Sequence, residues 1–275
     1  MTDSNLEKGR RAQMAESVSR SEQTVELEDR NRVARFGLIL LATDLTSEND
    51  LYRIANHPAL AVHATRIAYK NPTTPQNLRR MEPDLTAGAD LLVPGEPLHA
   101  IVYSCTSASV VIGDDAVAKA IGESRPGVPV ITPPSAAREA LHALDANRLS
   151  ILTPYTVETS ESMAAYFAGH GFDILRFDCL GLDDDREMAR ISPQTIIEAA
   201  CATVLPETEA IFISCTALPA IGCIDAIEQR TGKPVVTSNQ ASAWAMLRAG
   251  GLNRVGSGYG RLFDTSPPVA PPEPA

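Results

Sequence analysis

The chain has 275 residues, 44% of them hydrophobic and 21% charged, a composition typical of a globular protein with a sizeable core. Its net charge of −10 comes from 34 acidic and 24 basic residues, which excludes the basic surplus of duplex-binding proteins and makes a nucleic-acid partner unexpected. No apolar stretch approaches the roughly 18 residues of a membrane helix, and the polar start MTDSNLEKGRRAQ is unlike a secretory signal. We therefore expect a cytoplasmic protein without membrane contact.

Residues 1–32 are polar and lack an apolar period, which predicts a flexible N-terminal arm. After them, short β-branched runs alternate with longer helical segments, the pattern of parallel sheets covered by helices. A first α/β half, residues 33–147, is expected to contain strands at 36–42, 61–69, 100–104 and 128–132. A second half, residues 148–238, is expected to contain strands at 149–155, 172–178, 210–214 and 234–238. A helix at 239–263 would complete the first half, and the proline-rich residues 264–275 would form a tail.

The two halves repeat the same landmarks in the same order. Ser104-Cys105-Thr106 matches Ser214-Cys215-Thr216, and each triplet closes an apolar run. Further on, the segment GVPVIT at 127–132 matches GKPVVT at 232–237. Such internal similarity indicates a duplicated unit. We predict two flavodoxin-like α/β halves related by pseudo-twofold symmetry, with parallel sheets and the active site between the halves.

Cys105 and Cys215 each stand where a strand is expected to end and a helix to begin. Ligand sites in open parallel sheets form at the carboxyl ends of the strands. Free N–H groups at a helix start would lower a thiol pKa from about 8.5, and they can also bind a carboxylate. If the halves face each other, the two thiols would act as an acid–base pair across one substrate carbon. Alternatively, one thiolate adds to that carbon while the other thiol delivers a proton. Neither route needs a metal or an organic cofactor, so none is expected.

The remaining three cysteines are expected to have a structural role. Cys179, Cys201 and Cys223 lie in apolar segments and are expected to pack as small core residues. The cysteine count is odd, no pair has C-x-x-C spacing and the histidines are scattered. Neither a disulfide framework nor a metal site is therefore expected.

Four segments carry a family resemblance: YSCTSAS around Cys105, LTPYT around Tyr155, ISCTALP around Cys215, and SNQASAW at 238–244. In these the chain resembles the aspartate/glutamate racemase superfamily, in its maleate cis–trans isomerase and arylmalonate decarboxylase branch. The resemblance implies that Cys105 is a nucleophile that adds to an alkene and that Cys215 handles the proton. Arylmalonate decarboxylases lack the first of these cysteines, so its presence argues against decarboxylation.

The same resemblance implies further site residues and a homodimer. Backbone amides after each cysteine, at Thr106–Ser107 and Thr216–Ala217, would hold the carboxylates of a small carboxylate substrate. The hydroxyl of Tyr155 would also help to bind it.

Two departures from the maleate isomerase pattern alter the expected substrate. Where that family has asparagine, this chain has Asp44, in ATDLT, and Asp185, in DDRE. Like charges about 4 Å apart repel by about 4 kcal/mol at an effective dielectric near 20, so a dicarboxylate would bind badly beside either one. The sequence is more similar to the racemase-like proteins of ectoine utilisation, which implies ectoine, hydroxyectoine or a derived diamino acid.

Other interpretations stay open from the sequence. Asp44 can instead assist Cys105 as a base, and both aspartates can be solvated loop carboxylates. The chain can be a maleate isomerase proper if both aspartates point away from the substrate. It can also be a non-catalytic sensor of a small ligand, which would tolerate serine in place of Cys105 and Cys215.

Overall fold

The computed structural model describes residues 19–252 and 258–265. Residues 1–18 of the expected arm and 266–275 of the expected tail lie outside these ranges. Residues 19–32 contain no helix or strand. The remainder, from Val33 onward, forms a separate compact unit.

The first half of this unit is built on a parallel sheet with the strand order β2-β1-β3-β4. The central strand β1 reads ARFGLILL and is almost wholly buried, as expected for a strand that helices cover on both faces. The strands are β1 (Ala34–Leu41), β2 (Leu60–Ile67), β3 (Ala100–Tyr103) and β4 (Val130–Ile131). The helices are α2 (Ser47–Ile54), α3 (Pro75–Arg79), α4 (Asp84–Asp90), α5 (Thr106–Ile112), α6 (Asp114–Ser124) and α7 (Pro133–Ala143).

The second half repeats this arrangement, with a parallel sheet of order β6-β5-β7-β8. Its strands are β5 (Arg148–Tyr155), β6 (Asp173–Leu182), β7 (Ala210–Ile213) and β8 (Val235–Thr237). Its helical segments are α8 (Val157–Gly169), α9 (Asp185–Met188), α10 (Pro193–Thr203), the 3-10 turn η1 (Ile221–Cys223), α11 (Ile224–Thr231), α12 (Ser238–Ala249) and η2 (Arg261–Asp264). The predicted fold class, two flavodoxin-like halves with parallel sheets, is therefore confirmed.

The repeated segments GVPVIT and GKPVVT form the same local structure in the two halves. Gly127 and Gly232 have φ angles of 79° and 71°, in the left-handed region that glycine adopts at little cost. After the short strand that follows, Thr132 and Thr237 each accept a backbone N–H and form a capping box at the start of α7 and α12. The repeat in the sequence thus corresponds to a repeated glycine turn, strand and helix cap.

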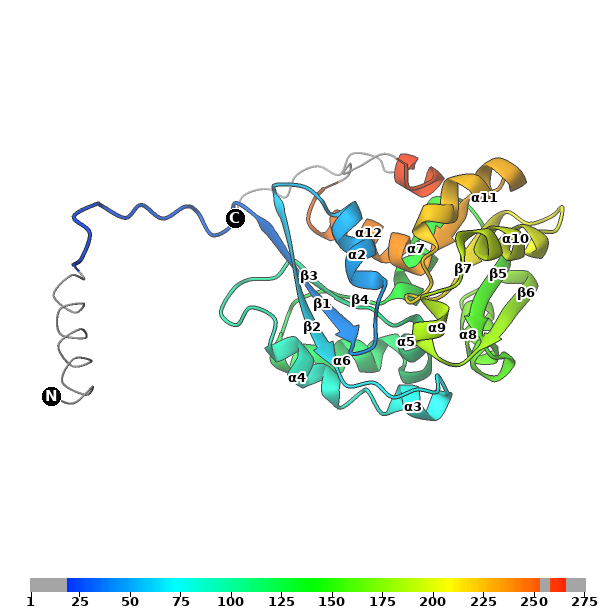
Figure 1. The fold of residues 1–275 in the computed structure, drawn as a ribbon, viewed down its shortest axis with the longest axis horizontal. Coiled ribbons are helices and arrows are strands. Elements are labelled where there is room, and N and C mark those ends of the chain that lie inside the picture. The colour runs from blue at the N-terminus through cyan, green and yellow to red at the C-terminus, as the bar shows by residue number, and fades with distance from the viewer. Residues whose placement is uncertain (1–18, 253–257, 266–275) are drawn as a thin grey trace, which may run out of the picture. The chain divides into compact units, whose positions relative to one another are not determined.

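Helices α5, α7 and α12 lie between the two sheets, and α12 packs against both α2 and α7 of the first half (Figure 1). One apolar cluster joins the halves, since Leu38 and Leu40 of β1 belong to it together with Ile151 of β5 and Trp244 of α12. The last helix was expected to run to residue 263, but α12 ends at Ala249. Residues 253–257 of that expected helix are outside the described ranges.

The helix that was expected directly after Cys215 is not formed, so that prediction is wrong. The chain runs irregularly from Thr216 to Ala220, and helical structure begins only with η1 and α11. Pro219 provides the reason, because proline disfavours the helical conformation in the residue before it and lacks an N–H. After Cys105, in contrast, α5 begins at Thr106 as predicted.

Candidate active site

Cys105 lies in a short connection at the carboxyl end of β3. It occupies the N-cap position of α5 in an extended conformation, with φ −152°. Its thiol receives a hydrogen bond from the Ala108 N–H, and the Ser107 hydroxyl lies 3.8 Å from its Sγ. The side chain is only 4% exposed.

Cys215 occupies the matching position at the carboxyl end of β7. Its backbone N–H donates to the Ser238 hydroxyl at 3.1 Å, and its side chain is 5% exposed. The N–H groups of Ala217 and Leu218 and the hydroxyl of Tyr155 hydrogen-bond to its thiol. Cys215 therefore faces two amide donors although no helix begins directly after it.

One small cavity of about 20 Å³ brings the two cysteines together from opposite halves. Such a volume holds about one water molecule, so a substrate with several carbons can enter only if the walls move apart. Of the residues predicted from the sequence, Thr106 does not line this cavity; its buried hydroxyl donates to Ser238 at 2.8 Å instead. The predicted residues that line the cavity are Asp44, Cys105, Ser107, Tyr155, Asp185, Cys215, Thr216 and Ala217.

The prediction that each thiol has a lowered pKa is wrong for the free protein. Burial raises the pKa of Cys105 to about 12, outweighing the Ala108 N–H and the Ser107 hydroxyl, which lower it. Burial likewise raises the pKa of Cys215 to about 11, although Tyr155 and the two backbone amides lower it. The sequence indicated that amide donors follow each cysteine, although the amides at the thiols are those of Ala108, Ala217 and Leu218, and it gave no measure of the desolvation that opposes them.

These raised pKa values predict how the thiols react. The alkylation rate of Cys215 by iodoacetamide should rise about tenfold per pH unit between about pH 7 and 10, because the thiolate fraction does so below the pKa. A thiol activated by a helix, with a pKa below about 8.5, would instead reach a plateau within that range. Peptide-resolved mass spectrometry of timed reactions distinguishes the two curves, and a plateau near pH 8 would contradict the assignment.

Asp44 closes the turn that leads from β1 into α2. Its Oδ1 accepts the N–H groups of Thr46 and Ser47 at 3.0 and 2.9 Å, and its Oδ2 accepts the Ser47 hydroxyl at 2.5 Å. Burial raises the pKa of Asp44, while the hydrogen bonds from Ser47 and Thr46 lower it. Among the described residues no hydrogen bond joins it to Cys105. The carboxyl group therefore stabilises the turn and also forms part of the cavity wall.

Asp185 begins α9 and links the two halves across the cavity. Its Oδ1 accepts the Asn71 Nδ2 at 2.8 Å and its Oδ2 accepts the Thr43 hydroxyl, both donors belonging to the first half. Asp44 and Asp185 are 5% and 6% exposed, so interpreting either as a solvated loop carboxylate is wrong. No lysine, arginine or histidine is among the described residues that line the cavity. Its titratable groups there are two carboxyl groups, two thiols and two tyrosine hydroxyls.

Sequence reasoning missed several residues of this cavity. Tyr69 and Thr73 follow the carboxyl end of β2, and their hydroxyl groups lie 2.6 Å apart. Because loops after parallel strands gather at one edge of a sheet, the segment AYKNPTT was a signal that could have identified them. Three further apolar residues of the wall come from different elements: Leu41, Leu78 and Met188.

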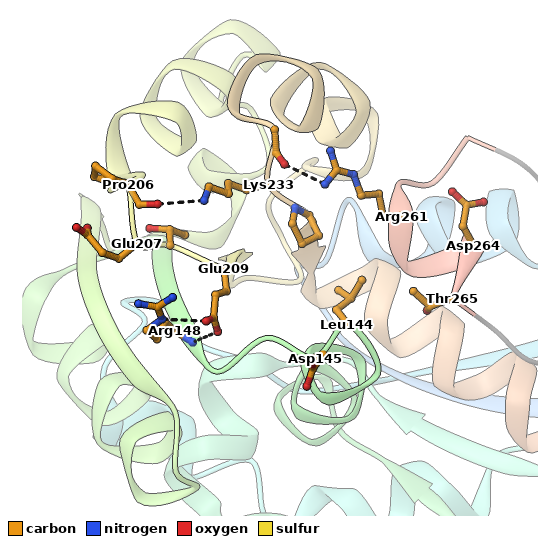
Figure 2. A pocket seen from close by; sticks show the side chains of 13 residues that line it. Leu144, Asp145, Arg148, Pro206, Glu207, Glu209, Lys233, Arg261, Asp264 and Thr265 are labelled. Atoms are coloured by element: carbon orange, nitrogen blue, oxygen red, sulfur yellow. Dashed lines mark hydrogen bonds and ion pairs between the residues drawn. The ribbon is translucent and has the colours of Figure 1, made fainter.

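A larger pocket of about 620 Å³ lies at the opposite ends of the strands of the second sheet (Figure 2). Its cationic groups are engaged by their own neighbours. Arg148 Nε donates to Glu209 Oε1 at 2.9 Å, Lys233 Nζ donates to the Pro206 carbonyl at 3.1 Å, and Arg261 Nη1 donates to the Gly232 carbonyl at 2.9 Å. None of its described lining residues is a cysteine, so despite its size it is not the site of the thiol chemistry.

In the part of the chain that the structure describes, no helix is both long and apolar enough to cross a membrane. In the same residues, no group of three or more histidine, cysteine or acidic side chains is placed to hold a metal ion. Of the other cysteines, Cys223 is buried and Cys179 and Cys201 are half-buried.

Known proteins resemble this chain over most of its length. A maleate isomerase from Nocardia farcinica is 28% identical over 242 residues, which cover 84% of this chain and 96% of that protein. An arylmalonate decarboxylase from Bordetella bronchiseptica is 33% identical over 143 residues, 51% of this chain and 60% of that protein. The structure of a cysteine-to-serine variant of the Nocardia farcinica maleate cis–trans isomerase, with a covalently bound succinylcysteine intermediate, superposes with a TM-score of 0.77. It is 26% identical and covers 84% of this chain and 98% of that one.

These similarities fix the enzyme class and the family. The maleate isomerases of Nocardia farcinica and Pseudomonas putida match 84% and 83% of the chain, and a structure of the former contains a covalent cysteine intermediate. This chain is accordingly an enzyme of the isomerase class. A family model described as arylmalonate decarboxylase matches residues 88–263, a range that includes both Cys105 and Cys215. The chain thus belongs to the arylmalonate decarboxylase family, in the branch that also contains the maleate isomerases.

Proposed function

We propose that the chain is a two-cysteine isomerase, of the racemase or epimerase type, that needs no cofactor and acts on a small, amino-acid-like carboxylate carrying an amino or other cationic group. The substrate class we assign is ectoine, hydroxyectoine or a diamino acid derived from them. The observation that supports the chemistry is the convergence of Cys105 and Cys215 on one cavity from opposite halves.

The reaction follows from two acid–base groups on opposite faces of one carbon. One thiolate removes the α-proton, so the C–H bond breaks and an S–H bond forms. The thiol on the other side gives up its proton to the opposite face, and the new C–H bond inverts the centre. Amides near Ser107, Ala217 and Leu218 would stabilise the negative charge that the carboxylate gains between these steps. Burial makes each thiolate a stronger base than a solvated one, which suits removal of a weakly acidic α-proton.

The preference for an amino group rests on the charge of the cavity wall. Asp44 and Asp185 line the cavity, and no cationic side chain does so among its described residues. Their side-chain hydrogen bonds come from neutral donors, and Arg66, whose charge lowers the pKa of Asp44, is not among the residues that line the cavity. A substrate ammonium group would offset that charge, whereas a second carboxylate would add to it.

A maleate isomerase is the alternative, and the relatives favour it. The Nocardia farcinica enzyme forms a succinylcysteine intermediate, and this chain has cysteines in both halves that could form and resolve such an adduct. A sensor without catalytic activity is a further alternative, which no described feature of the site favours.

Proton exchange followed by NMR in deuterated water, without added cofactor, tests the proposal. The panel contains ectoine, hydroxyectoine, diaminobutyrate derivatives, aspartate and maleate, each with wild type and with the Cys105→Ser and Cys215→Ser variants. Deuterium uptake at an α-carbon that depends on both cysteines supports the proposal and identifies the substrate class. Conversion of maleate to fumarate would instead establish the alternative, and tight binding without turnover would indicate a sensor.

A further inference from the structure

The two cysteine loops are held in different ways although both begin with the triplet Ser-Cys-Thr. Cys105 caps α5, so the helix itself fixes the N–H groups beyond it. After Cys215 no helix forms before residue 221, yet the N–H groups of Ala217 and Leu218 both reach its thiol. Other groups must therefore hold these two peptides in place.

Hydrogen bonds to two carbonyl groups provide that support. In a trans peptide the C=O and the N–H point in opposite directions, so anchoring the oxygen on one side directs the N–H to the other. The Thr216 carbonyl shares a peptide with the Ala217 N–H and accepts the Asn239 Nδ2 at 2.9 Å. The Ala217 carbonyl shares a peptide with the Leu218 N–H and accepts the Thr46 hydroxyl at 2.7 Å.

A buried carboxylate orients the first of these anchors. Asn239 Nδ2 also donates to Asp50 Oδ2 at 2.9 Å, while Asn239 Oδ1 is buried and has no hydrogen-bond partner among the described residues. Both bonds that fix the amide are thus made by Nδ2, one to Asp50 and one to the loop. Asp50 and Asn239 are 6% and 2% exposed, so water does not compete with this arrangement.

Ser47 does not replace Asn239 in this role. Its hydroxyl oxygen lies 3.2 Å from the Thr216 carbonyl but 2.5 Å from Asp44 Oδ2. A hydroxyl has one proton, and a charged acceptor at the shorter distance takes it. Asn239 is therefore the donor that satisfies the Thr216 carbonyl.

We propose that Thr46, Asn239 and Asp50 are positioning residues for Cys215, which hold two peptides so that their N–H groups point at its sulfur and stabilise the thiolate. Two side chains from the first half and one from α12 thereby do for Cys215 what α5 does for Cys105. The catalytic meaning of this arrangement rests on the proposed function, but its effect on the thiol does not.

The Thr46→Val variant tests the proposal, because valine keeps the shape of the side chain and removes the hydroxyl donor. Losing one amide hydrogen bond should raise the pKa of Cys215 by about one unit, which lowers its thiolate fraction about tenfold. The nucleophilicity of the remaining thiolate rises with its pKa, so the net alkylation rate should fall about threefold. Iodoacetamide labelling of the full-length protein at about pH 9, resolved by peptide, measures Cys215 and Cys105 in the same sample. The rate at Cys105 should stay unchanged.

Matched variants separate positioning from general loosening of the fold. Thr46→Ser keeps the donor and should restore the Cys215 rate. Thr153→Val removes another buried hydroxyl, bonded to Ser160 at 2.8 Å, and should leave the ratio of the two rates unchanged. Asn239→Leu, like Thr46→Val, should lower the ratio of the Cys215 rate to the Cys105 rate. It replaces Thr46→Val as the test if that variant does not fold. Parallel changes at both cysteines, or an unchanged ratio in Thr46→Val and Asn239→Leu, would overturn the proposal. Because no substrate is used, this outcome is independent of the NMR test.

Discussion

Replacing Cys105 or Cys215 by serine is expected to lower turnover of the substrate by roughly 10²- to 10⁴-fold in each case, because each thiol transfers a proton that a serine hydroxyl transfers poorly. The double variant should be little slower than either single one, since the two groups act on the same carbon as a unit. Initial rates of the racemisation or isomerisation identified by NMR, compared at equal protein concentration, give all three values.

The control for this comparison is Cys201→Ser, which changes a half-buried cysteine of α10 outside the cavity. It should retain wild-type activity. If one of the two cavity variants also retained it, the chemistry would depend on a single cysteine, and the paired mechanism would be contradicted.

Asp185→Asn is expected to raise KM for an amino-bearing substrate by about 10- to 100-fold, because a charge interaction of about 1.4 to 2.7 kcal/mol is lost. The fold should tolerate the change. Asn71 can still donate to the new amide oxygen, and the Thr43 hydroxyl can rotate to accept from the amide nitrogen. KM values for the substrate that NMR identifies and a binding titration with maleate provide the measurement, and affinity for maleate should improve.

Glu187→Gln is the matched control, because it removes the same charge from an exposed position of the same short helix, α9. It should leave KM unchanged. If Asp185→Asn had no more effect than Glu187→Gln, the charge of the cavity wall would not select the substrate, and the preference for an amino group would lose its support.

The sequence allowed the two-halved fold to be predicted because its strands are short, apolar and repeated. Runs such as FGLILL and AIFI have no polar residue to place on an exposed face, which leaves a central parallel strand as the natural solution. The repeated serine–cysteine–threonine triplets then located both thiols at strand ends. The prediction failed where local chemistry broke the repeat, because Pro219 has no counterpart in the TSASVV segment after Cys105.

The burial and the pKa values of the site residues were harder to predict than their identities. Whether amide donors or burial controls a thiol pKa depends on how completely the two halves close over the thiol. The hydrophobic periodicity of the sequence does not predict the extent of this closure. The same holds for Tyr69, Asn71 and Thr73, which come from a loop whose sequence is not among the matched segments of the two halves. Their contacts with the second half arise only once both sheets have folded, as Thr73 N–H donating to the Asp183 carbonyl at 2.7 Å illustrates.

The distribution of deuterium between product and unreacted substrate tests the central claim most directly. One enantiomer of the substrate that NMR identifies is converted in deuterated water and examined at low conversion. Two cysteines on opposite faces predict deuterium in the product enantiomer and almost none in the recovered substrate, because the thiol that removes the proton is not the one that donates. Equal labelling of both enantiomers at the earliest times would show that one group serves both faces, and it would contradict the paired-cysteine account.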